Sequence, residues 1–505
     1  MIEISAIETK SLGDRGYLVT DGETALVIDP QRDFDRVLRL SAERGAEISH
    51  VFETHLHNDY VTGGYALARA TGAAYHVNAA DQVTFERTPV ADGDVIEAGG
   101  LRLRALATPG HTFTHLSYAL EDAGHGTVIA VFTGGSLLYG STGRTDLLGA
   151  EHQVELARAQ HRSARRLARE LPDAVAVCPT HGFGSFCSAT QTTGTSSTIG
   201  DEKRVNPALT MAEADFVETT LAGLDAYPAY YAHMGPANAA GPGAPDLSPP
   251  RRADAAELRR RIDAGEWVVD LRSRTAFAAG HLRGALNFEL GDSFVTYLGW
   301  LIPWGTPLTL IGATAADVAA AQRDLVRIGI DRLAAAAAGP PGEWSGKEPL
   351  SSFAVADFAE LERARELGSV VVLDVRRNGE WAQSRVPGAV HIPLHELPAR
   401  IGELPGGQVW VHCHSGYRAS VAASLLDAAA VPVVLVDDEI ERAERAGLAR
   451  PAPGTGAPGT GAPPGTVAPG TVAPEPVTPH VSPRYPAPRR WPPHGESDGL
   501  TRHSP

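Results

Sequence analysis

The sequence predicts a chain of three α/β domains followed by a disordered tail rich in proline and glycine. Three observations support this fold class. The length of 505 residues corresponds to about three domains of ordinary size. Apolar segments of strand length alternate with helical patterns through most of the chain, as in sheets that are covered by helices. Two stretches dominated by Gly, Pro and Ala, residues 235–250 and 451–505, interrupt this alternation.

The charge and cysteine content exclude several classes of protein. Lys and Arg number 44 against 60 Asp and Glu, a net charge of −16, which argues against binding nucleic acid or anionic membranes. Three cysteines are too few for a disulfide scaffold. No apolar run approaches the ~20 residues of a membrane span, and the first residues lack the pattern of a signal peptide. We therefore expect a soluble, cytoplasmic enzyme or scaffold.

Residues 1–234 mix strands and helices in a way that predicts an α/β sandwich. Glycines at 99 and 100 mark the turn of a hairpin, and the last helix is strongly charged on one face. Strands are expected at residues 16–19, 25–28, 48–53 and 128–132, the hairpin at 95–106, and helices at 34–44 and 151–170.

Residues 251–345 and 350–446 are predicted to be two copies of one small α/β domain. The segment 268–272 (VVDLR) resembles 372–376 (VLDVR), and the Gly-Ala pair at 284–285 resembles that at 388–389. The same offset separates both pairs, and an apolar strand follows in each copy. Residues 235–250 are expected to be a linker. The tail, residues 451–505, repeats variants of APGT and cannot offset the entropy of ordering.

Histidines that follow apolar strands predict a metal centre in the first domain. His55 and His57 stand in a single motif with Asp59, while His111 and His181 each lie in a glycine-containing turn. Imidazole suits Zn, Fe, Ni and Cu, and four histidines in this setting are hard to explain by packing. Six other histidines lack the setting and are expected to be structural: His50, His76, His115, His125, His152 and His161.

These motifs resemble the metallo-β-lactamase fold superfamily, whose signature is His-x-His-x-Asp-His and whose fold is an αββα sandwich. Four further stretches resemble its persulfide dioxygenase branch, with glyoxalase II hydrolases as the nearest sister group: DPQRD at 29–33, HLHNDYVTGG at 55–64, TPGH at 108–111 and VFTGGSLLYGSTGRTD at 131–146. The resemblance implies one ferrous iron, held by two histidines and an aspartate. It also implies oxidation of a glutathione-type persulfide by O₂ to sulfite and thiol.

The sequence departs from this pattern at two positions. Tyr60 stands where the signature has its last histidine, which removes a ligand of a second metal ion. Gly135 stands where the stretch Phe-Thr-Gly-Asp carries the ligand aspartate. We therefore expect one metal ion per chain, Fe(II) by resemblance, with Zn(II) as the alternative because three histidines and an open position form a catalytic zinc site. The predicted metal-binding residues are His55, His57, His111, Asp59 and His181, of which Asp59 is also a candidate catalytic residue.

Arg144 is a candidate for binding a substrate carboxylate, because its guanidinium can form bidentate pairs. A structural salt bridge with Asp146 is an equal alternative.

The last domain carries a cysteine loop with the properties of a nucleophile. Cys413 follows the strand 409–412 and precedes a helix expected over 419–429, and main-chain N–H groups at a helix N-terminus stabilise a thiolate. The loop resembles the Cys-x-x-Gly-x-Arg loop of rhodanese sulfurtransferases, and its spacing suits a sulfur atom rather than the phosphate of Cys-x₅-Arg phosphatases. Cys413 and Arg418 are therefore predicted to be catalytic, with Ser415 and Gly416 binding substrate.

The remaining cysteine positions complete the interpretation. The first copy has no cysteine in the corresponding loop, at 308–314, and is predicted to be an inactive module with a structural or docking role. Cys178 lies in an apolar strand, which predicts a core position, and no role is predicted for Cys187.

The main hypothesis is a persulfide dioxygenase fused to a sulfurtransferase, in which Cys413 carries sulfur to sulfite. A zinc thioester hydrolase of glyoxalase II type and a non-catalytic sulfur-relay or sensing module are the alternatives. The implied partners are small molecules, namely a thiol persulfide, sulfite and thiosulfate. The thiol carrier and self-association into a homo-oligomer stay open.

Overall fold

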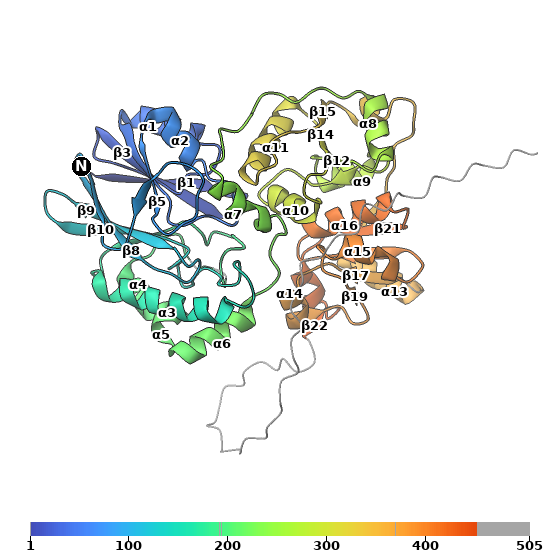
Figure 1. The fold of residues 1–505 in the computed structure, drawn as a ribbon. Coiled ribbons are helices and arrows are strands. Elements are labelled where there is room, and N and C mark those ends of the chain that lie inside the picture. Colours follow the sequence, from blue (N-terminus) through green and yellow to red (C-terminus); the bar gives the residue numbers. More distant parts are fainter. Residues whose placement is uncertain (1, 191, 193, 369, 452–505) are drawn as a thin grey trace, which may run out of the picture.

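The computed structural model describes residues 2–190, 192, 194–368 and 370–451. Its first domain contains two sheets packed face to face (Figure 1). The first sheet has strands in sequence order: β1 (Glu3–Thr9), β2 (Asp14–Thr20), β3 (Thr24–Ile28), β4 (Glu47–Phe52), β5 (Ala74–Asn78) and β6 (Thr88–Val90). The second sheet has the order β11-β10-β9-β8-β7, from β7 (Val95–Ala98), β8 (Leu101–Ala107), β9 (Leu116–Asp122), β10 (Thr127–Gly134) and β11 (Ala176–Pro179).

Apolar side chains explain this layering. Phe52 from the first sheet and Leu103 and Phe132 from the second belong to one buried cluster between the sheets. Helices cover the outer faces: α1 (Asp35–Arg44) and α2 (Gly64–Thr71) on the first sheet, and α3 (Gln153–Glu170), α4 (Ile199–Val205), α5 (Pro207–Thr210) and α6 (Glu213–Gly223) on the second. The predicted αββα sandwich is thus confirmed.

The second domain has a parallel sheet of order β13-β12-β14-β15. Its elements are α8 (Ala255–Asp263), β12 (Trp267–Asp270), α9 (Arg274–Ala279), β13 (Leu286–Asn287), α10 (Phe294–Leu301), β14 (Leu308–Gly312), α11 (Ala315–Arg327), β15 (Ala335–Ala338) and α12 (Pro341–Ser345).

The third domain repeats this plan with a parallel sheet of order β16-β21-β20-β17-β19. Its elements are β16 (Ala354–Ala356), α13 (Phe358–Leu367), β17 (Val371–Asp374), α14 (Asn378–Gln383), β18 (Ser384–Arg385), β19 (Val390–His391), α15 (Leu397–Arg400), the 3₁₀ turn Ile401–Glu403, β20 (Val409–His412), α16 (Tyr417–Ala428), β21 (Val433–Val436), α17 (Ile440–Arg445) and β22 (Arg450–Pro451). The repeated α/β architecture is confirmed.

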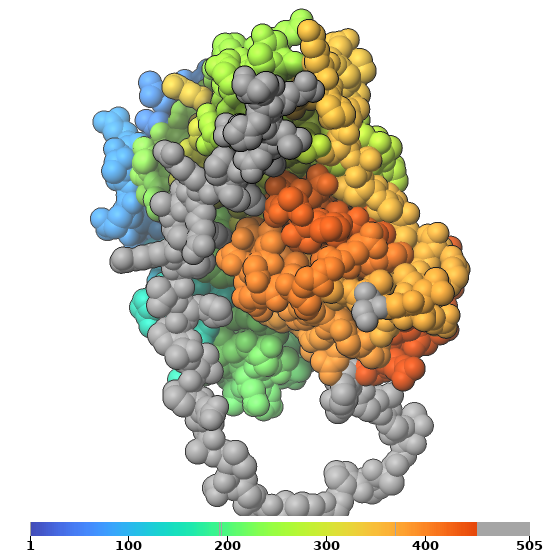
Figure 2. Space-filling view, turned by 90° about the vertical axis from the view of Figure 1, so that its right-hand side faces the viewer, coloured from blue at the N-terminus to red at the C-terminus, as the bar shows by residue number. Residues whose placement is uncertain are grey.

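The three domains share a buried interface. One apolar cluster contains Cys187 from the first domain, Leu298 from α10 of the second and Cys413 from the third. Figure 1 shows α10 between the other two domains, and Figure 2 shows the second and third domains in direct contact. A buried ion pair reinforces this packing, because Arg327 donates two hydrogen bonds to the carboxylate of Asp33, at 3.1 and 2.7 Å.

The expected linker begins later than the sequence suggested. Helix α7 (Tyr231–Ala239) extends into it despite Pro236, because its side chains are anchored by the first domain. The amide of Asn238 donates to the main-chain oxygens of His57 and Tyr60, both at 2.8 Å. No helix in the described part of the chain is long and apolar enough to cross a membrane. The tail prediction concerns residues 452–505, which lie outside the described residues.

Candidate metal centre and cysteine loop

Four histidines from separate loops converge at one edge of the sandwich, where strands of both sheets end. His55 and His57 follow β4, His111 follows β8 and His181 follows β11. The ring centroid of His55 lies 4.1 Å from that of His57, 4.8 Å from that of His111 and 5.4 Å from that of His181. All four residues are at most 1% exposed. Imidazoles packed this closely and away from water suit a transition-metal ion.

The hydrogen bonds of these rings leave nitrogen atoms for such an ion. His111 Nδ1 donates to the main-chain oxygen of Arg144 at 2.8 Å, and His111 Nε2 has no partner among the described residues. His181 Nδ1 lies 2.9 Å from Asp14 Oδ1, and His55 Nδ1 lies 2.9 Å from a threonine hydroxyl. Ligating histidines are commonly held through their second nitrogen in this way. Burial lowers the pKa of His55 and that of His111, the latter to about 3, so both rings are neutral.

His57 faces two directions. Its Nε2 lies 3.0 Å from the hydroxyl of Tyr60 and 3.2 Å from a carboxylate oxygen of both Asp29 and Glu53. Burial alone would lower the pKa of His57, but these carboxylates outweigh it and raise the pKa to about 9. Only Nδ1, which has no partner among the described residues, remains for an ion at the histidine cluster. The phenol of Tyr60 thus lies against the Nε2 atom of this ring.

Asp59 lies at the edge of the cluster. Its Oδ2 is 3.2 Å from His181 Nδ1, whereas His181 Nε2 is the atom that approaches His55, at 3.4 Å. The carboxylates of Asp59 and Asp14 outweigh burial and raise the pKa of His181, so this ring carries a proton that a metal ion would displace. Asp59 thus lies beside His181, and ligand atoms of Asp14, Asp59 and His181 all lie within 4.8 Å of one another. The role of Asp59 as a metal ligand stays a prediction.

The Cys413 loop has the predicted position between a strand and a helix. Cys413 follows β20 and is buried, and α16 begins at Tyr417. Gly416 has φ +90°, and a Cβ there would lie 2.0 Å from a carboxylate oxygen of Asp437, so only glycine fits. Arg418 donates hydrogen bonds of 2.5 and 2.7 Å to the two carboxylate oxygens of Glu380. Its charge is therefore partly neutralised by this partner.

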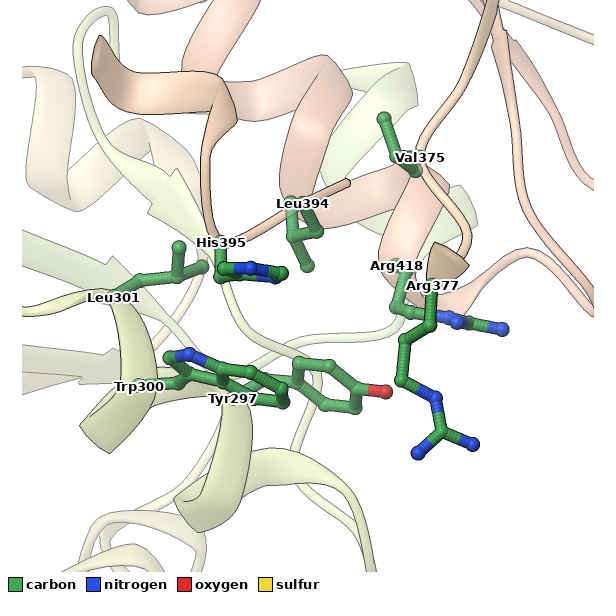
Figure 3. Close-up of a pocket in the computed structure, with 8 residues that line it drawn as sticks. All are labelled: Tyr297, Trp300, Leu301, Val375, Arg377, Leu394, His395 and Arg418. Atoms are coloured by element: carbon green, nitrogen blue, oxygen red, sulfur yellow. The ribbon is translucent and has the colours of Figure 1, made fainter. Parts of the chain in front are cut away.

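A small pocket lies beside the Cys413 loop at the contact between the second and third domains (Figure 3). Tyr297 and Trp300 of α10 form one side, and Trp300 stacks on His395 with centroids 4.9 Å apart. Three basic and three apolar side chains complete the lining, which comprises Tyr297, Trp300, Leu301, Val375, Arg377, Leu394, His395 and Arg418. The guanidinium groups of Arg377 and Arg418 both pair with Glu380, so the pocket offers guanidinium donors whose charge is partly balanced.

Family models match all three domains. The metallo-beta-lactamase superfamily model matches residues 16–181, and the rhodanese-like domain model matches residues 254–332 and 357–444. The chain is a metallo-beta-lactamase domain joined to two rhodanese-like domains. Both matches agree with the resemblances inferred from the histidine motifs and the Cys413 loop.

Relatives of known activity resemble the metallo-beta-lactamase domain. The human mitochondrial persulfide dioxygenase ETHE1 is 29% identical over 216 residues, which cover 43% of this chain and 76% of that protein. A hydroxyacylglutathione hydrolase from Cereibacter sphaeroides is 33% identical over 177 residues, 34% of this chain and 62% of that protein. A metallo-beta-lactamase structure from Staphylococcus aureus has 28% identity and a TM-score of 0.60, and covers 67% of this chain and 99% of its own. The metallo-beta-lactamase domain therefore belongs to a family of enzymes.

Arg144 shows the structural arrangement that was the alternative to substrate binding. Its guanidinium donates two hydrogen bonds to Asp146, at 2.7 and 2.8 Å. It also donates to the main-chain oxygens of Phe186 and Asp225, at 3.1 and 2.8 Å. The side chain is 4% exposed. Because the guanidinium makes these four hydrogen bonds within the protein, Arg144 is placed to hold the loops around the candidate metal centre.

Sequence reasoning missed two residues that contact the metal centre. Cys187 is fully buried, and its sulfur lies within 4.8 Å of a ligand nitrogen of both His111 and His181. Burial, together with the charges of Asp59 and Asp14, raises the pKa of this thiol. Asp14, which holds His181, stands at the start of β2 with no motif around it. Only the place of Cys187 in a Gly/Ser loop after His181 could have drawn attention to it.

The expectation that His115 and His125 are structural agrees with their surroundings. His115 lies 2.9 Å from the hydroxyl of Thr108 and accepts a hydrogen bond of 3.0 Å from Gly135 N, so both of its nitrogens have protein partners. His125 is exposed and pairs with Asp122 at 2.9 Å. His125 therefore offers a control position far from the metal chemistry.

Proposed function

We propose that the metallo-beta-lactamase domain oxidises a low-molecular-weight thiol persulfide to sulfite, and that Cys413 transfers sulfane sulfur in the same pathway. The observation that carries this proposal is the contact between the two sites. Phe186, the neighbour of Cys187, packs on Trp300 with ring centroids 5.1 Å apart, and the guanidinium of Arg377 lies 5.3 Å from its ring centre. Trp300 and Arg377 line the pocket beside Cys413. This adjacency supports a function in which one site uses the product of the other.

The two reactions balance as follows. A persulfide, O₂ and water give the thiol, hydrogen sulfite and a proton. The Cys413 thiolate takes the outer sulfur of a second persulfide, whose thiolate leaves. Sulfite then attacks the outer sulfur of this Cys413 persulfide, which yields thiosulfate and restores the Cys413 thiolate. Activation of O₂ is the chemistry that iron(II) would supply when held by His55, His111 and their neighbours. Arg377 and Arg418 would hold the sulfite anion, and Ser415 and Gly416 would shape the loop around the sulfur.

The main alternative is a zinc-dependent thioester hydrolase carrying a rhodanese domain. The resemblance to hydroxyacylglutathione hydrolases and the glycine at position 135 favour it. The hydroxyl of Tyr60 against His57 argues against a second metal ion. We place the chemistry in the cytoplasm, because a reducing compartment keeps the three free cysteines as thiols.

Metal analysis combined with O₂ uptake tests this proposal. Full-length protein purified without oxygen is expected to contain about one metal ion per chain and to consume O₂ with glutathione persulfide. His111→Ala should remove the metal ion and the activity, whereas His125→Ala should change neither. Hydrolysis of a hydroxyacylglutathione without O₂ uptake would support the hydrolase instead. About two metal ions per chain would contradict the mononuclear centre, and absence of both activities would favour a relay module.

A further inference from the structure

Position 135, where the resembled family carries its ligand aspartate, has no room for an aspartate side chain in this protein. A Cβ built on Gly135 would lie 2.4 Å from His111 Cδ2, and one built on Gly143 would lie 2.7 Å from His111 Nδ1. Both distances are shorter than any real Cβ contact, so the imidazole lies between two glycines that cannot be replaced without moving it. The ring of His111 occupies the space beside the main chain that a side chain at 135 would need.

Cys187 brings a sulfur atom, a possible metal ligand, close to the same ring. Its sulfur and the ligand nitrogens of His111 and His181 all lie within 4.8 Å of one another. His111 Nε2 is fully buried and has no hydrogen-bond partner among the described residues. A buried, unpaired nitrogen is costly unless something binds it. The lone pair of His111 Nε2 and the sulfur of Cys187 therefore point to one metal ion that binds both residues.

The loop that carries Cys187 is held in place by its main chain. Arg144 N donates to the carbonyl oxygen of Cys187 at 2.7 Å, and Cys187 N donates to the hydroxyl of Ser185 at 3.2 Å. The guanidinium of Arg144 adds the bond of 3.1 Å to Phe186 O. The same Arg144 fixes His111 through its own carbonyl oxygen. One residue thus sets the positions of both the imidazole and the thiol, as expected for a preorganised site.

We propose that Cys187 is a metal ligand beside His111 and His181 and takes the place of the aspartate that the resemblance implies. This inference rests on the proposed function insofar as it requires a metal ion at this centre. On binding, the thiol loses its proton to solvent and the sulfur forms a bond to the ion. One thiolate has the same charge as one carboxylate, so the net charge of the centre is retained. A thiolate with imidazoles is a ligand combination typical of zinc and of other borderline-soft divalent ions.

The test uses the full-length protein freed of metal and reloaded with one equivalent of Zn(II) or Co(II), without added thiols. X-ray absorption of the zinc form is expected to show one sulfur neighbour at ~2.3 Å. The cobalt form is expected to show thiolate-to-metal charge-transfer absorption in the near ultraviolet. Cys187→Ser should abolish both signals and weaken Zn(II) affinity by at least about 10–100-fold, the range for losing a mere supporting partner. Cys178→Ser and Cys413→Ser are matched controls and should retain both signals.

The outcomes separate this inference from the proposed function. One bound metal ion with only nitrogen and oxygen neighbours would overturn the thiolate ligand and leave the metal centre intact. Persistence of the sulfur signal in Cys187→Ser would also overturn it. Failure to bind any metal ion would contradict the proposed function as well. If Cys187→Ser does not fold, the Cys178→Ser/Cys413→Ser double variant decides the question, because Cys187 is then the only thiol in the chain.

Discussion

Replacing Arg144 with methionine distinguishes a residue that builds the metal centre from one that binds substrate. The change removes four hydrogen bonds, two to Asp146 and one each to the carbonyl oxygens of Phe186 and Asp225. The main-chain bonds of residue 144 to His111 and Cys187 depend on those contacts for their position. Loss of such support typically weakens metal binding about 10–100-fold, which corresponds to about 1.4–2.7 kcal/mol. Because Asp146 keeps some exposure, we expect a stability loss of about 3 kcal/mol, near the lower end for a broken buried pair.

The assay is a competition titration of Zn(II) against a chromophoric chelator, with circular dichroism as a check on folding. Arg166→Met is the matched control. Arg166 is half-buried on α3 and also binds a carbonyl oxygen and two carboxylates. These partners, Ala107, Asp92 and Glu170, do not belong to the histidine cluster, so Arg166→Met should leave Zn(II) affinity unchanged. Native folding with unchanged Zn(II) affinity in Arg144→Met would refute the structural reasoning. A raised KM for persulfide in that case would instead show that Arg144 binds the substrate.

Three further predictions concern the rest of the chain. The hydrogen bonds from Arg418 outweigh burial and lower the pKa of Glu380 from 4.5 to about 2. The ion pair therefore stabilises the fold above pH ~4.5, and its contribution of about 3 kcal/mol to the free energy of unfolding is lost as the pH falls towards 2. Chemical denaturation at pH 6 and pH 3 should show a smaller acid-induced loss of stability in Glu380→Gln than in the wild type. Arg327→Met leaves the buried Asp33 without its main partner and should cost about 3–5 kcal/mol, seen as a lower Tm by calorimetry, and adding Asp33→Asn should recover part of it; an unchanged Tm would show that the ion pair does not hold the domains together. Deleting residues 452–505 should leave activity and melting unchanged, since repeats of this composition do not fold alone; a large loss of either would show that the tail binds the folded domains.

Local sequence patterns predicted the strands and the loops that follow them. Apolar runs such as 48–53 and 409–412 correspond to β4 and β20, because burial of a strand leaves a strong signal in a few adjacent residues. The polar side chains directly after such runs, His55 and Cys413 among them, could be recognised for the same reason.

Contacts between distant segments could not be predicted in this way. Asp14 reaches His181 from a strand more than a hundred residues earlier, and Cys187 approaches His111 only because two loops meet over the sheet edge. Asn238 lies in a stretch that looked like a linker, yet it holds the main chain of the His57 loop. In each case tertiary packing brings the residue to its site, and the residues next to it in the sequence do not indicate that role.

The central claim is that one chain contains two separable sulfur reactions, oxidation at the metal centre and transfer at Cys413. Product analysis of Cys413→Ser during O₂ uptake with added persulfide tests it most directly. The variant is expected to consume O₂ like the wild type while sulfite accumulates in place of thiosulfate, with no residual sulfur transfer from the second domain. Loss of O₂ uptake in the variant, or continued formation of thiosulfate, would contradict the claim.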